Sequence, residues 1–171
     1  MHPTAHSPHI DGFAFAEGAK SLRGTWRVAD LPRLQDLVAA KEGALEYEVR
    51  GARDDFGRAA LKVSVTGALQ LTCQRCLKPM RFMLDLEATL VLARTEEEIE
   101  SQPVEPEGPD RVVGSREMAV GTLLEDEILL AIPFAPRHEQ CSGDAEKKGE
   151  TQASPFANLR GMLTKGGPTR N

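Results

Sequence analysis

The segment Leu61-Lys-Val-Ser-Val-Thr-Gly-Ala-Leu-Gln-Leu71 decides the predicted fold, because apolar side chains occupy nearly every second position along it. Such alternation predicts a β-strand with one buried face and one face in water. Residues 45–50 before it and 82–92 after it alternate in the same way. Since the connections between the three segments are short, we expect three long strands paired in an antiparallel meander.

Two other segments have the spacing of helices. Asp30 can cap a helix that carries Pro32 in its first turn and ends at Gly43, with leucines recurring at helical spacing between them. Apolar and acidic side chains separate onto two faces over residues 118–130, which predicts a second helix. The predicted fold class is therefore α+β: an antiparallel β-meander of three or more long strands, covered by two helices on its apolar face.

The remaining segments indicate one domain with tails. Residues 1–12 are polar and rich in Pro and His, and are expected to form a flexible tail. Residues 13–141 make up the predicted single domain, which includes a flexible acidic loop at 94–116. Residues 142–171 are expected to be a mostly disordered tail with a short docking segment at 155–163.

The composition of the whole chain excludes several classes of protein. The chain has 171 residues and a formal net charge of −5, and none of its apolar runs approaches the roughly 18 residues of a membrane helix. Its N-terminus lacks the basic and apolar regions of a secretory signal, so a soluble cytoplasmic protein is expected. The three cysteines, an odd number, argue against a disulfide framework.

The sharpest motif is Cys73-Gln-Arg-Cys76, because two residues between cysteines allow both thiolates to reach one metal ion from a tight turn. A structural zinc site needs four ligands, and the later segment His138-Glu-Gln-Cys141 offers two more. Two alternatives stay open: a redox pair, or cysteines that merely belong to a turn. A redox pair of the thioredoxin type precedes a helix, whereas strands are predicted on both sides of this motif.

Charge is unevenly distributed around the cysteines. Arg75, Lys78 and Arg81, together called the basic turn below, lie close together with no acidic residue between them, whereas residues 96–110 contain seven acidic residues and no basic ones. The basic turn could hold RNA phosphates. The alternative is that it serves only solubility, and the negative net charge of the chain counts against nucleic-acid binding.

Other candidate residues point away from catalysis. Glu125, Asp126 and Glu127 are consecutive on the predicted second helix, so they point in different directions and are expected to form a solvated helix face. Trp26 could stack on a base, but a core or half-buried position is the preferred interpretation. The sequence shows no glycine-rich phosphate loop after a strand and no nucleophile elbow, so neither an enzyme nor a small-molecule substrate is predicted.

Several segments carry a resemblance in matching order: Leu71–Leu77, Leu123–Pro133, His138, Cys141 and Pro155–Leu159. Together they resemble the YceD family, the bacterial large ribosomal RNA subunit accumulation proteins. The resemblance implies a role in the synthesis, processing or stability of 23S ribosomal RNA, without an established catalytic activity. Cys73, Arg75 and Cys76 match the family's central motif, and residues 125–127 match its helix motif. Some relatives carry a second CxxC after that helix, where this chain has only a histidine and one cysteine.

The leading hypothesis is a noncatalytic factor for biogenesis of the large ribosomal subunit, which binds precursor ribosomal RNA or a ribosomal protein of that subunit. An alternative is a small zinc-dependent or thiol redox enzyme that uses Cys73 and Cys76. A third is a structural partner protein whose sheet edge pairs with another chain. Metal content, thiol pKa and charge reversal in the basic turn distinguish the three.

Overall fold

The computed structural model describes residues 8–103 and 108–141. The chain divides into two compact units, residues 1–138 and 139–171, and the fold below is that of the first unit. The expected tail at residues 1–7, and the expected disordered tail from residue 142 with its docking segment at 155–163, lie outside the described residues. Within the described residues, no helix is both long and apolar enough to cross a membrane.

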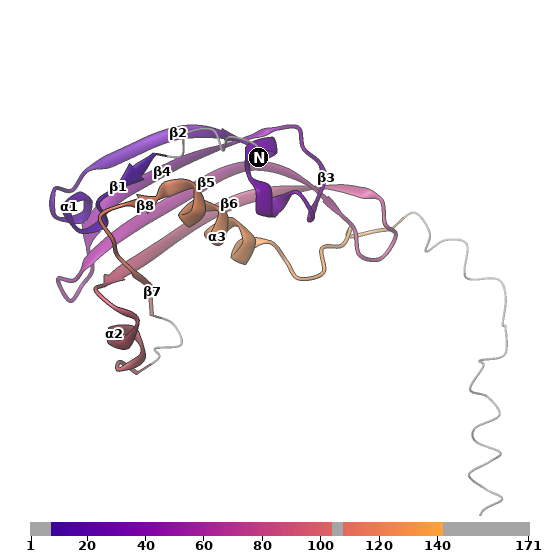
Figure 1. Ribbon diagram of the computed structural model, residues 1–171. Coiled ribbons are helices and arrows are strands. Elements are labelled where there is room, and N and C mark those ends of the chain that lie inside the picture. Colours follow the sequence, from indigo (N-terminus) through magenta and orange to yellow (C-terminus); the bar gives the residue numbers. More distant parts are fainter. Residues whose placement is uncertain (1–7, 104–107, 142–171) are drawn as a thin grey trace, which may run out of the picture. The chain divides into compact units, whose positions relative to one another are not determined.

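The first unit consists mainly of strands, with short helices between them (Figure 1). Its elements in chain order are β1 (His9–Ile10), α1 (Gly12–Glu17), β2 (Ser21–Arg27), the 3-10 helices η1 (Val28–Asp30) and η2 (Pro32–Leu34), β3 (Val38–Ala40), β4 (Ala44–Arg53), β5 (Ala59–Thr72), β6 (Pro79–Ala93), α2 (Glu96–Glu100), β7 (Asp110–Val113), β8 (Met118–Ala119) and α3 (Val120–Ala131). The predicted α+β class is confirmed.

The main sheet has six strands, with the order β2-β4-β5-β6-β7 and with β3 also paired to β5. The three predicted long strands are β4, β5 and β6, which pair as antiparallel neighbours. β7 runs parallel to β6, so the sheet as a whole differs from the simple meander that the alternation predicts. β1 and β8 form a separate two-stranded sheet.

The alternation in β5 places one row of side chains in the core. Each residue of this row is at most 2% exposed: Leu61, Val63, Val65, Leu69 and Leu71. The remaining inward position is occupied by Gly67. A larger residue does not fit there, because a Cβ would lie 2.6 Å from Cδ2 of Leu45. Burial of one such Val or Leu side chain contributes about 1.5–3 kcal/mol relative to its exposure to water.

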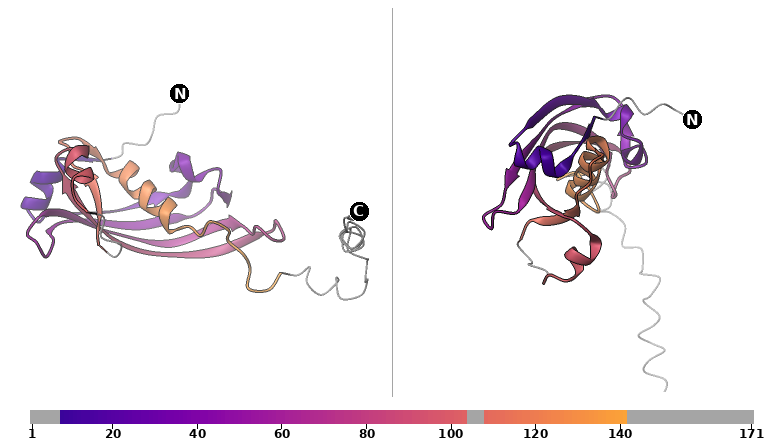
Figure 2. Two further views of the ribbon diagram at one scale, coloured as in Figure 1. Left: turned by 90° about the horizontal axis from the view of Figure 1, so that it is seen from below. Right: turned by 60° about the vertical axis from the view of Figure 1, so that its left-hand side comes forward.

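The helix α3 covers the concave, apolar face of this sheet (Figures 1 and 2). Val120, Leu124 and Ile128 recur at helical spacing and are at most 2% exposed, and they belong to the same core cluster as the inward residues of β5. The predicted helix at 118–130 is therefore confirmed, except that its first two residues form β8 and pair with β1.

The predicted helix between Asp30 and Gly43 is wrong, because this segment forms η1, η2 and β3. The residues of β3 pair with β5. Gln35 Nε2 donates to the carbonyl oxygens of Val28 and Leu31, at 2.7 and 2.9 Å, and so occupies acceptors that a continuing helix would use. Strand pairing and side-chain bonds thus override the local helical spacing.

Two regions that the sequence predicts to be flexible contain regular structure. Residues 94–116 include β7 and α2, whose N-cap Thr95 accepts the N–H of Glu98 at 3.3 Å. Residues 8–12 form β1 and the Asp11 cap of α1. Capping and strand pairing satisfy backbone groups in these parts of the predicted tail and loop, and residues 104–107 of the loop lie outside the described residues.

Candidate metal centre

The two cysteines of the CxxC motif lie in the turn between β5 and β6, where the alternation predicts them. Backbone bonds close this turn: Cys73 N–H donates to Lys78 O at 3.0 Å, and Leu77 N–H donates to Cys73 O at 2.9 Å. Leu77, directly after Cys76, has a φ of 58°. This left-handed conformation costs a residue with a Cβ about 1–2 kcal/mol, and such strain is typical of functional turns.

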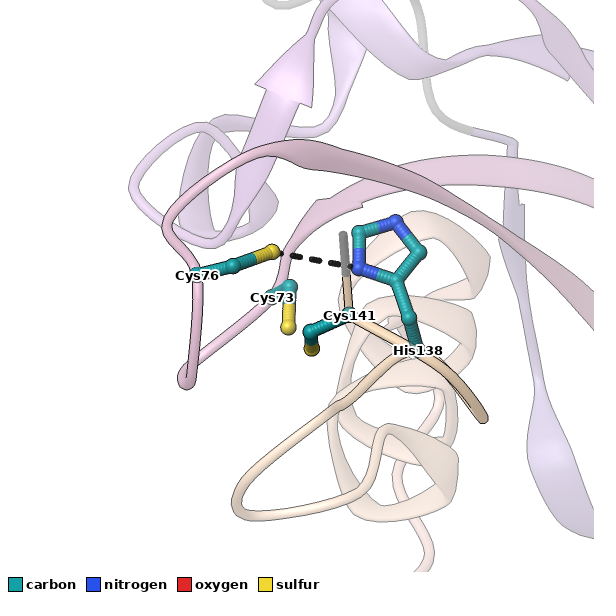
Figure 3. A group of neighbouring side chains, drawn as sticks. All are labelled: Cys73, Cys76, His138 and Cys141. Carbon is teal, nitrogen blue, oxygen red and sulfur yellow. Dashed lines mark hydrogen bonds between the residues drawn. The ribbon is translucent and has the colours of Figure 1, made fainter. Parts of the chain in front are cut away.

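The segment after α3 brings His138 to this turn. Gln74 N–H donates to Pro136 O at 2.8 Å and joins the two segments. His138 Nδ1 lies 3.4 Å from Cys76 Sγ (Figure 3), and His138 Nε2 lies 3.2 Å from Pro79 O. A proton on Nε2 that is donated to the Pro79 carbonyl leaves Nδ1 free to ligate a metal, and metal-binding histidines are commonly oriented in this way.

The chain itself keeps Cys141 close to His138, because only two residues separate them. One potential ligand atom of each of Cys73, Cys76, His138 and Cys141 lies within 4.8 Å of the others (Figure 3). In a tetrahedral zinc site, bonds of about 2.3 Å to sulfur and about 2.0 Å to nitrogen place the ligand atoms about 3.5–3.8 Å apart. The four side chains therefore fit a zinc ion after small adjustments of their positions.

Cys73 is suited to bind a metal as a thiolate. Its side chain is fully buried, and burial alone raises the pKa of a thiol. Hydrogen bonds from the backbone N–H groups of Cys76, His138 and Arg75 outweigh burial and lower the pKa of Cys73 to about 5; the Arg75 N–H donates to Cys73 Sγ at 3.4 Å. Since zinc binds the thiolate, such a thiol binds it with little competition from protons.

The donor set limits what a metal could do at this position. Thiolate and imidazole ligands select zinc over magnesium or calcium, which prefer oxygen ligands. Four protein ligands would fill a tetrahedral shell and leave no open position for water or substrate. The geometry therefore suits a structural zinc site, in which the ion ties the hairpin turn to the segment that follows α3.

The basic turn lies directly beside the cysteines. Arg75, Lys78 and Arg81 are all exposed, the first two in the turn itself and Arg81 near the start of β6. Arg81 lies opposite Gln70 in the register of β5 and β6. A turn fixed by a metal would hold the backbone that carries these charges in one conformation. The placement is compatible with a surface that binds a partner, and binding itself stays a prediction.

The helix motif at 125–127 differs from the solvated face that the sequence predicts. Glu125 and Glu127 are 4% and 7% exposed, whereas the side chain of Asp126 is 47% exposed. Glu125 Oε1 accepts the backbone N–H groups of Arg33 and Leu34, at 2.6 and 3.2 Å, and Asp126 forms an ion pair with the Arg33 side chain. The prediction is wrong for Glu125 because η2 supplies two backbone donors that need an acceptor.

The second buried carboxylate is Glu127. Burial, followed by the negative charges of Asp110 and Asp126, raises the pKa of Glu127. Burial disfavours the charged form of a carboxylate, and neighbouring negative charges act in the same direction. The solvated-face prediction is therefore wrong for this glutamate as well, and two of the three acidic residues of the motif belong to the packed interior.

Trp26 packs at the margin of the core. Its ring lies 5.5 Å from that of Tyr47, measured between centroids, and both side chains are partly buried against the core cluster. Burial also raises the pKa of Tyr47. The preferred interpretation of Trp26 as a core or half-buried residue is confirmed, with the half-buried position the one observed.

Sequence reasoning missed a group of arginines at the other end of the hairpin formed by β5 and β6: Arg53, Arg58, Arg94 and Arg111. They belong to β4, to the residues flanking β5 and β6, and to β7. Only the strand register brings them together, since Ala60, Val91 and Arg111 are neighbours across three strands. No spacing within the sequence signals this group, because the parallel position of β7 is not readable from it.

The fold and the site define a small strand-rich α+β protein with a candidate structural zinc centre at a hairpin turn. Residues 61–162, more than half of the chain, match the family model of the large ribosomal RNA subunit accumulation protein YceD. The chain belongs to the YceD family, as its motifs predict. The matched range includes the hairpin from Leu61 onward, the cysteine turn and α3. No solved structure was found to match the chain.

Proposed function

We propose that the protein is a noncatalytic factor for biogenesis of the large ribosomal subunit, which supports the synthesis, processing or stability of 23S ribosomal RNA. The observation that carries this proposal is membership of the YceD family, whose description names accumulation of large-subunit ribosomal RNA. The closed donor set of the candidate zinc centre supports a noncatalytic role, because catalytic zinc sites keep one position open. A cytoplasmic location goes with this role.

The partner is precursor ribosomal RNA, bound through the basic turn, or a ribosomal protein of the large subunit. Zinc held by Cys73, Cys76, His138 and Cys141 would act as a cross-link that stiffens this turn. Exposed cations on a rigid turn favour RNA, because Lys and Arg side chains make most contacts to phosphates. A ribosomal protein is the other candidate, through acidic residues such as those of α2.

A thiol redox enzyme is the second candidate function, and the lowered pKa of Cys73 is the observation in its favour. Reactive cysteines combine a low pKa with access to solvent. Cys73 is fully buried, so a substrate disulfide cannot approach its sulfur. The low pKa, which the backbone hydrogen bonds cause, therefore suits a metal ligand better than a redox nucleophile.

Complementation in cells depleted of the protein tests the proposed function. Depletion is expected to lower 23S relative to 16S ribosomal RNA and to reduce free and assembled large subunits in gradient profiles, and the wild-type gene restores both. A variant with Arg75, Lys78 and Arg81 each changed to Gln is expected to restore them poorly. If depletion leaves 23S levels and subunit profiles unchanged, the proposed function is wrong.

A matched control removes three exposed cations elsewhere, by changing Arg23, Lys41 and Arg116 to Gln. This control has the same net charge as the variant of the basic turn, so a general effect of charge affects both equally. Full complementation by the control and poor complementation by the variant locate the effect in the basic turn. Equal complementation by the two proteins contradicts a role for that turn.

A further inference from the structure

A recess of about 230 Å³ lies at the end of the main sheet that is remote from the cysteines. Its charged lining consists of Arg53, Arg58, Arg94 and Arg111 against Glu17 and Glu98. Positive charge thus exceeds negative charge here, although the whole chain has a net charge of −5. A local excess of this kind requires a physical explanation, because like charges that converge on one recess repel one another.

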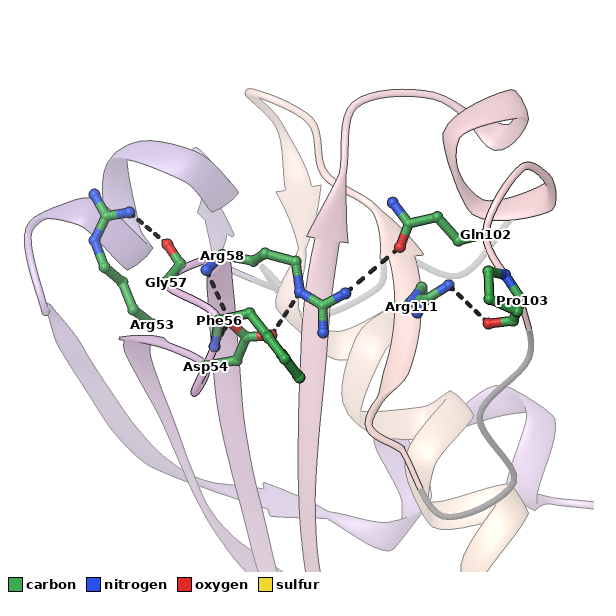
Figure 4. A network of polar contacts seen from close by, with 8 residues as sticks. All are labelled: Arg53, Asp54, Phe56, Gly57, Arg58, Gln102, Pro103 and Arg111. Atoms are coloured by element: carbon green, nitrogen blue, oxygen red, sulfur yellow. Dashed lines mark hydrogen bonds and ion pairs between the residues drawn. The ribbon is translucent and has the colours of Figure 1, made fainter.

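Arg58 is held firmly at the centre of this group (Figure 4). Its Nε donates to Asp54 Oδ2 at 2.6 Å, its backbone N–H donates to Asp54 Oδ1 at 2.7 Å, and its Nη1 lies 3.5 Å from Gln102 Oε1. Its Nη2 is buried and has no hydrogen-bond partner among the residues that the structure describes. A buried guanidinium donor without an acceptor is unfavourable, so the recess presents a fixed N–H group that lacks an anionic oxygen.

The other three arginines of the recess contact neutral groups. Arg53 Nη1 donates to Gly57 O at 2.8 Å, and Arg111 Nη1 lies 3.5 Å from Pro103 O (Figure 4). The Arg94 guanidinium lies over the Phe13 ring, 5.3 Å from its centroid. Among the residues that the structure describes, none of these three guanidinium groups forms an ion pair with an acidic side chain. They retain donors for an incoming anion.

The carboxylates near the recess are engaged or peripheral. Asp54 is paired with Arg58, and the interaction with the Arg58 guanidinium and backbone lowers the pKa of Asp54 against the effect of burial. Glu98 Oε2 accepts the backbone N–H of Arg94 at 2.7 Å. Glu17 is exposed on the last turn of α1. These groups neutralise part of the charge and leave the guanidinium groups in excess.

An exposed aromatic ring adjoins the same arginine. Phe56 is 76% exposed, and the Arg58 guanidinium lies 5.1 Å from its ring centroid. A large exposed ring beside a cluster of guanidinium groups is the arrangement on which proteins stack unpaired bases, with the backbone phosphate held by Arg. An acidic peptide would use the charges but would leave the ring without a function. The recess is also smaller than the sites of about 300–1,000 Å³ that enclose small molecules.

We propose that this recess binds a backbone phosphate of single-stranded RNA through Arg58, Arg94 and Arg111, and that a neighbouring base stacks on Phe56. The inference rests on the proposed function and deepens it by naming a second contact with RNA. The β5–β6 hairpin would then carry RNA contacts at both of its ends. The contact reads no sequence, because phosphate and stacking are common to all nucleotides.

The test measures binding of the full-length protein to a fluorescently labelled single-stranded RNA of mixed sequence, by anisotropy at several KCl concentrations. Changing Arg94 and Arg111 to Gln is expected to weaken binding about tenfold and to lower the slope of log K against log salt by about 0.7 for each phosphate that the protein no longer neutralises. Phe56→Ala is expected to weaken binding about fivefold, whereas Phe56→Tyr, which keeps an aromatic ring, is expected to bind RNA as the wild type does. Arg58 is left intact, because its replacement would leave Asp54 unpaired.

Arg23→Gln is the control, because Arg23 lies on β2 at the opposite edge of the sheet from β7 and its side chain is 70% exposed. Binding by the Arg94 and Arg111 variant that equals binding by this control overturns the inference. So does a poly-glutamate peptide that binds as tightly as RNA and loses affinity in the same variant, since the recess would then serve an acidic protein.

The proposed function and this inference can fail separately. If the variant of the basic turn loses RNA binding and the recess variants do not, the inference fails and the proposed function stands. If the wild-type protein binds no RNA, the inference fails, whereas the proposed function is still judged by 23S levels in depleted cells.

Discussion

Replacement of Glu125 by Ala is expected to destabilise the fold by about 3 kcal/mol. Glu125 is 4% exposed, and its Oε1 accepts two backbone N–H groups, those of Arg33 and Leu34. A hydrogen bond to a charged group contributes about 1.5–3 kcal/mol. The Leu34 bond is buried and the Arg33 bond is part-buried, so we take the lower bound for each and add the two to reach about 3 kcal/mol. This loss is a large part of the roughly 5–15 kcal/mol by which domains are usually stable.

Urea denaturation followed by Trp26 fluorescence measures this loss, because the chain has a single tryptophan and it packs against Tyr47. With a slope of about 2 kcal/mol per molar urea, the midpoint should fall by about 1.5 M. Glu125→Gln keeps an acceptor oxygen, so its free energy of unfolding should fall much less than that of Glu125→Ala. Asp126→Asn breaks an ion pair whose two side chains are 47% and 51% exposed, so it should cost less than about 1 kcal/mol. Equal midpoints for Glu125→Ala and Asp126→Asn refute the reasoning.

Three further outcomes follow from the structure. Protein purified without a tag in the presence of zinc should contain one zinc ion per chain by atomic absorption, and Cys76→Ser should contain far less; an unchanged metal content contradicts the site. Hydrogen bonds from Arg50, Arg23 and Ser21 lower the pKa of Glu48 to about 2. The contribution of Glu48 to the free energy of unfolding is therefore present above about pH 4.5 and is lost as the pH falls toward 2. In the Glu48→Gln variant, the free energy of unfolding should depend less on pH over this range. Gly67→Ala should cost about 1–3 kcal/mol, because its φ is +154° and the new Cβ would lie 2.6 Å from Leu45 Cδ2; a midpoint equal to that of the wild type contradicts this packing.

The three long strands could be predicted because their signal is local. A strand with one buried face repeats every second residue, and Leu61 to Leu71 follow that period without interruption except at Gly67. The helix expected after Asp30 could not be distinguished from turns in this way. The structure of this segment depends on Glu125, which lies 92 positions further along the chain from Arg33, and on the pairing of β3 with β5. Long-range partners of this kind leave no trace in a local pattern.

The candidate zinc centre was predictable in part for the same reason. Cys73 and Cys76 are neighbours in sequence, and the two flanking strands fix them in one turn. The approach of His138 depends on where α3 ends and on the bond from Gln74 to Pro136. Sequence spacing offered His138 and Cys141 as ligands, and the geometry brings all four side chains together.

The burial of Glu125 and Glu127 changes the meaning of the family's helix motif. An acidic run on a helix looks like a surface, but here two of the carboxylates lie in the interior. The motif positions η2 through backbone N–H groups, and η2 leads into β3, which pairs with the end of β5 next to Cys73. Substitution of Glu125 should therefore disturb the cysteine turn through packing, without any contact to a ligand.

The β5–β6 hairpin links the two candidate binding regions mechanically. The 14 residues of β5 span about 45 Å of strand path at about 3.3 Å per residue, with the cysteines after its last residue and Arg58 before its first. The core row of β5 lies between them and belongs to the same core cluster as Val120, Leu124 and Ile128 of α3, and none of its residues is a candidate zinc ligand. Loss of zinc should therefore loosen the basic turn and leave the arginine recess intact. A chelator should accordingly weaken RNA binding to the level of the basic-turn variant and no further, whereas removal of both regions should abolish it.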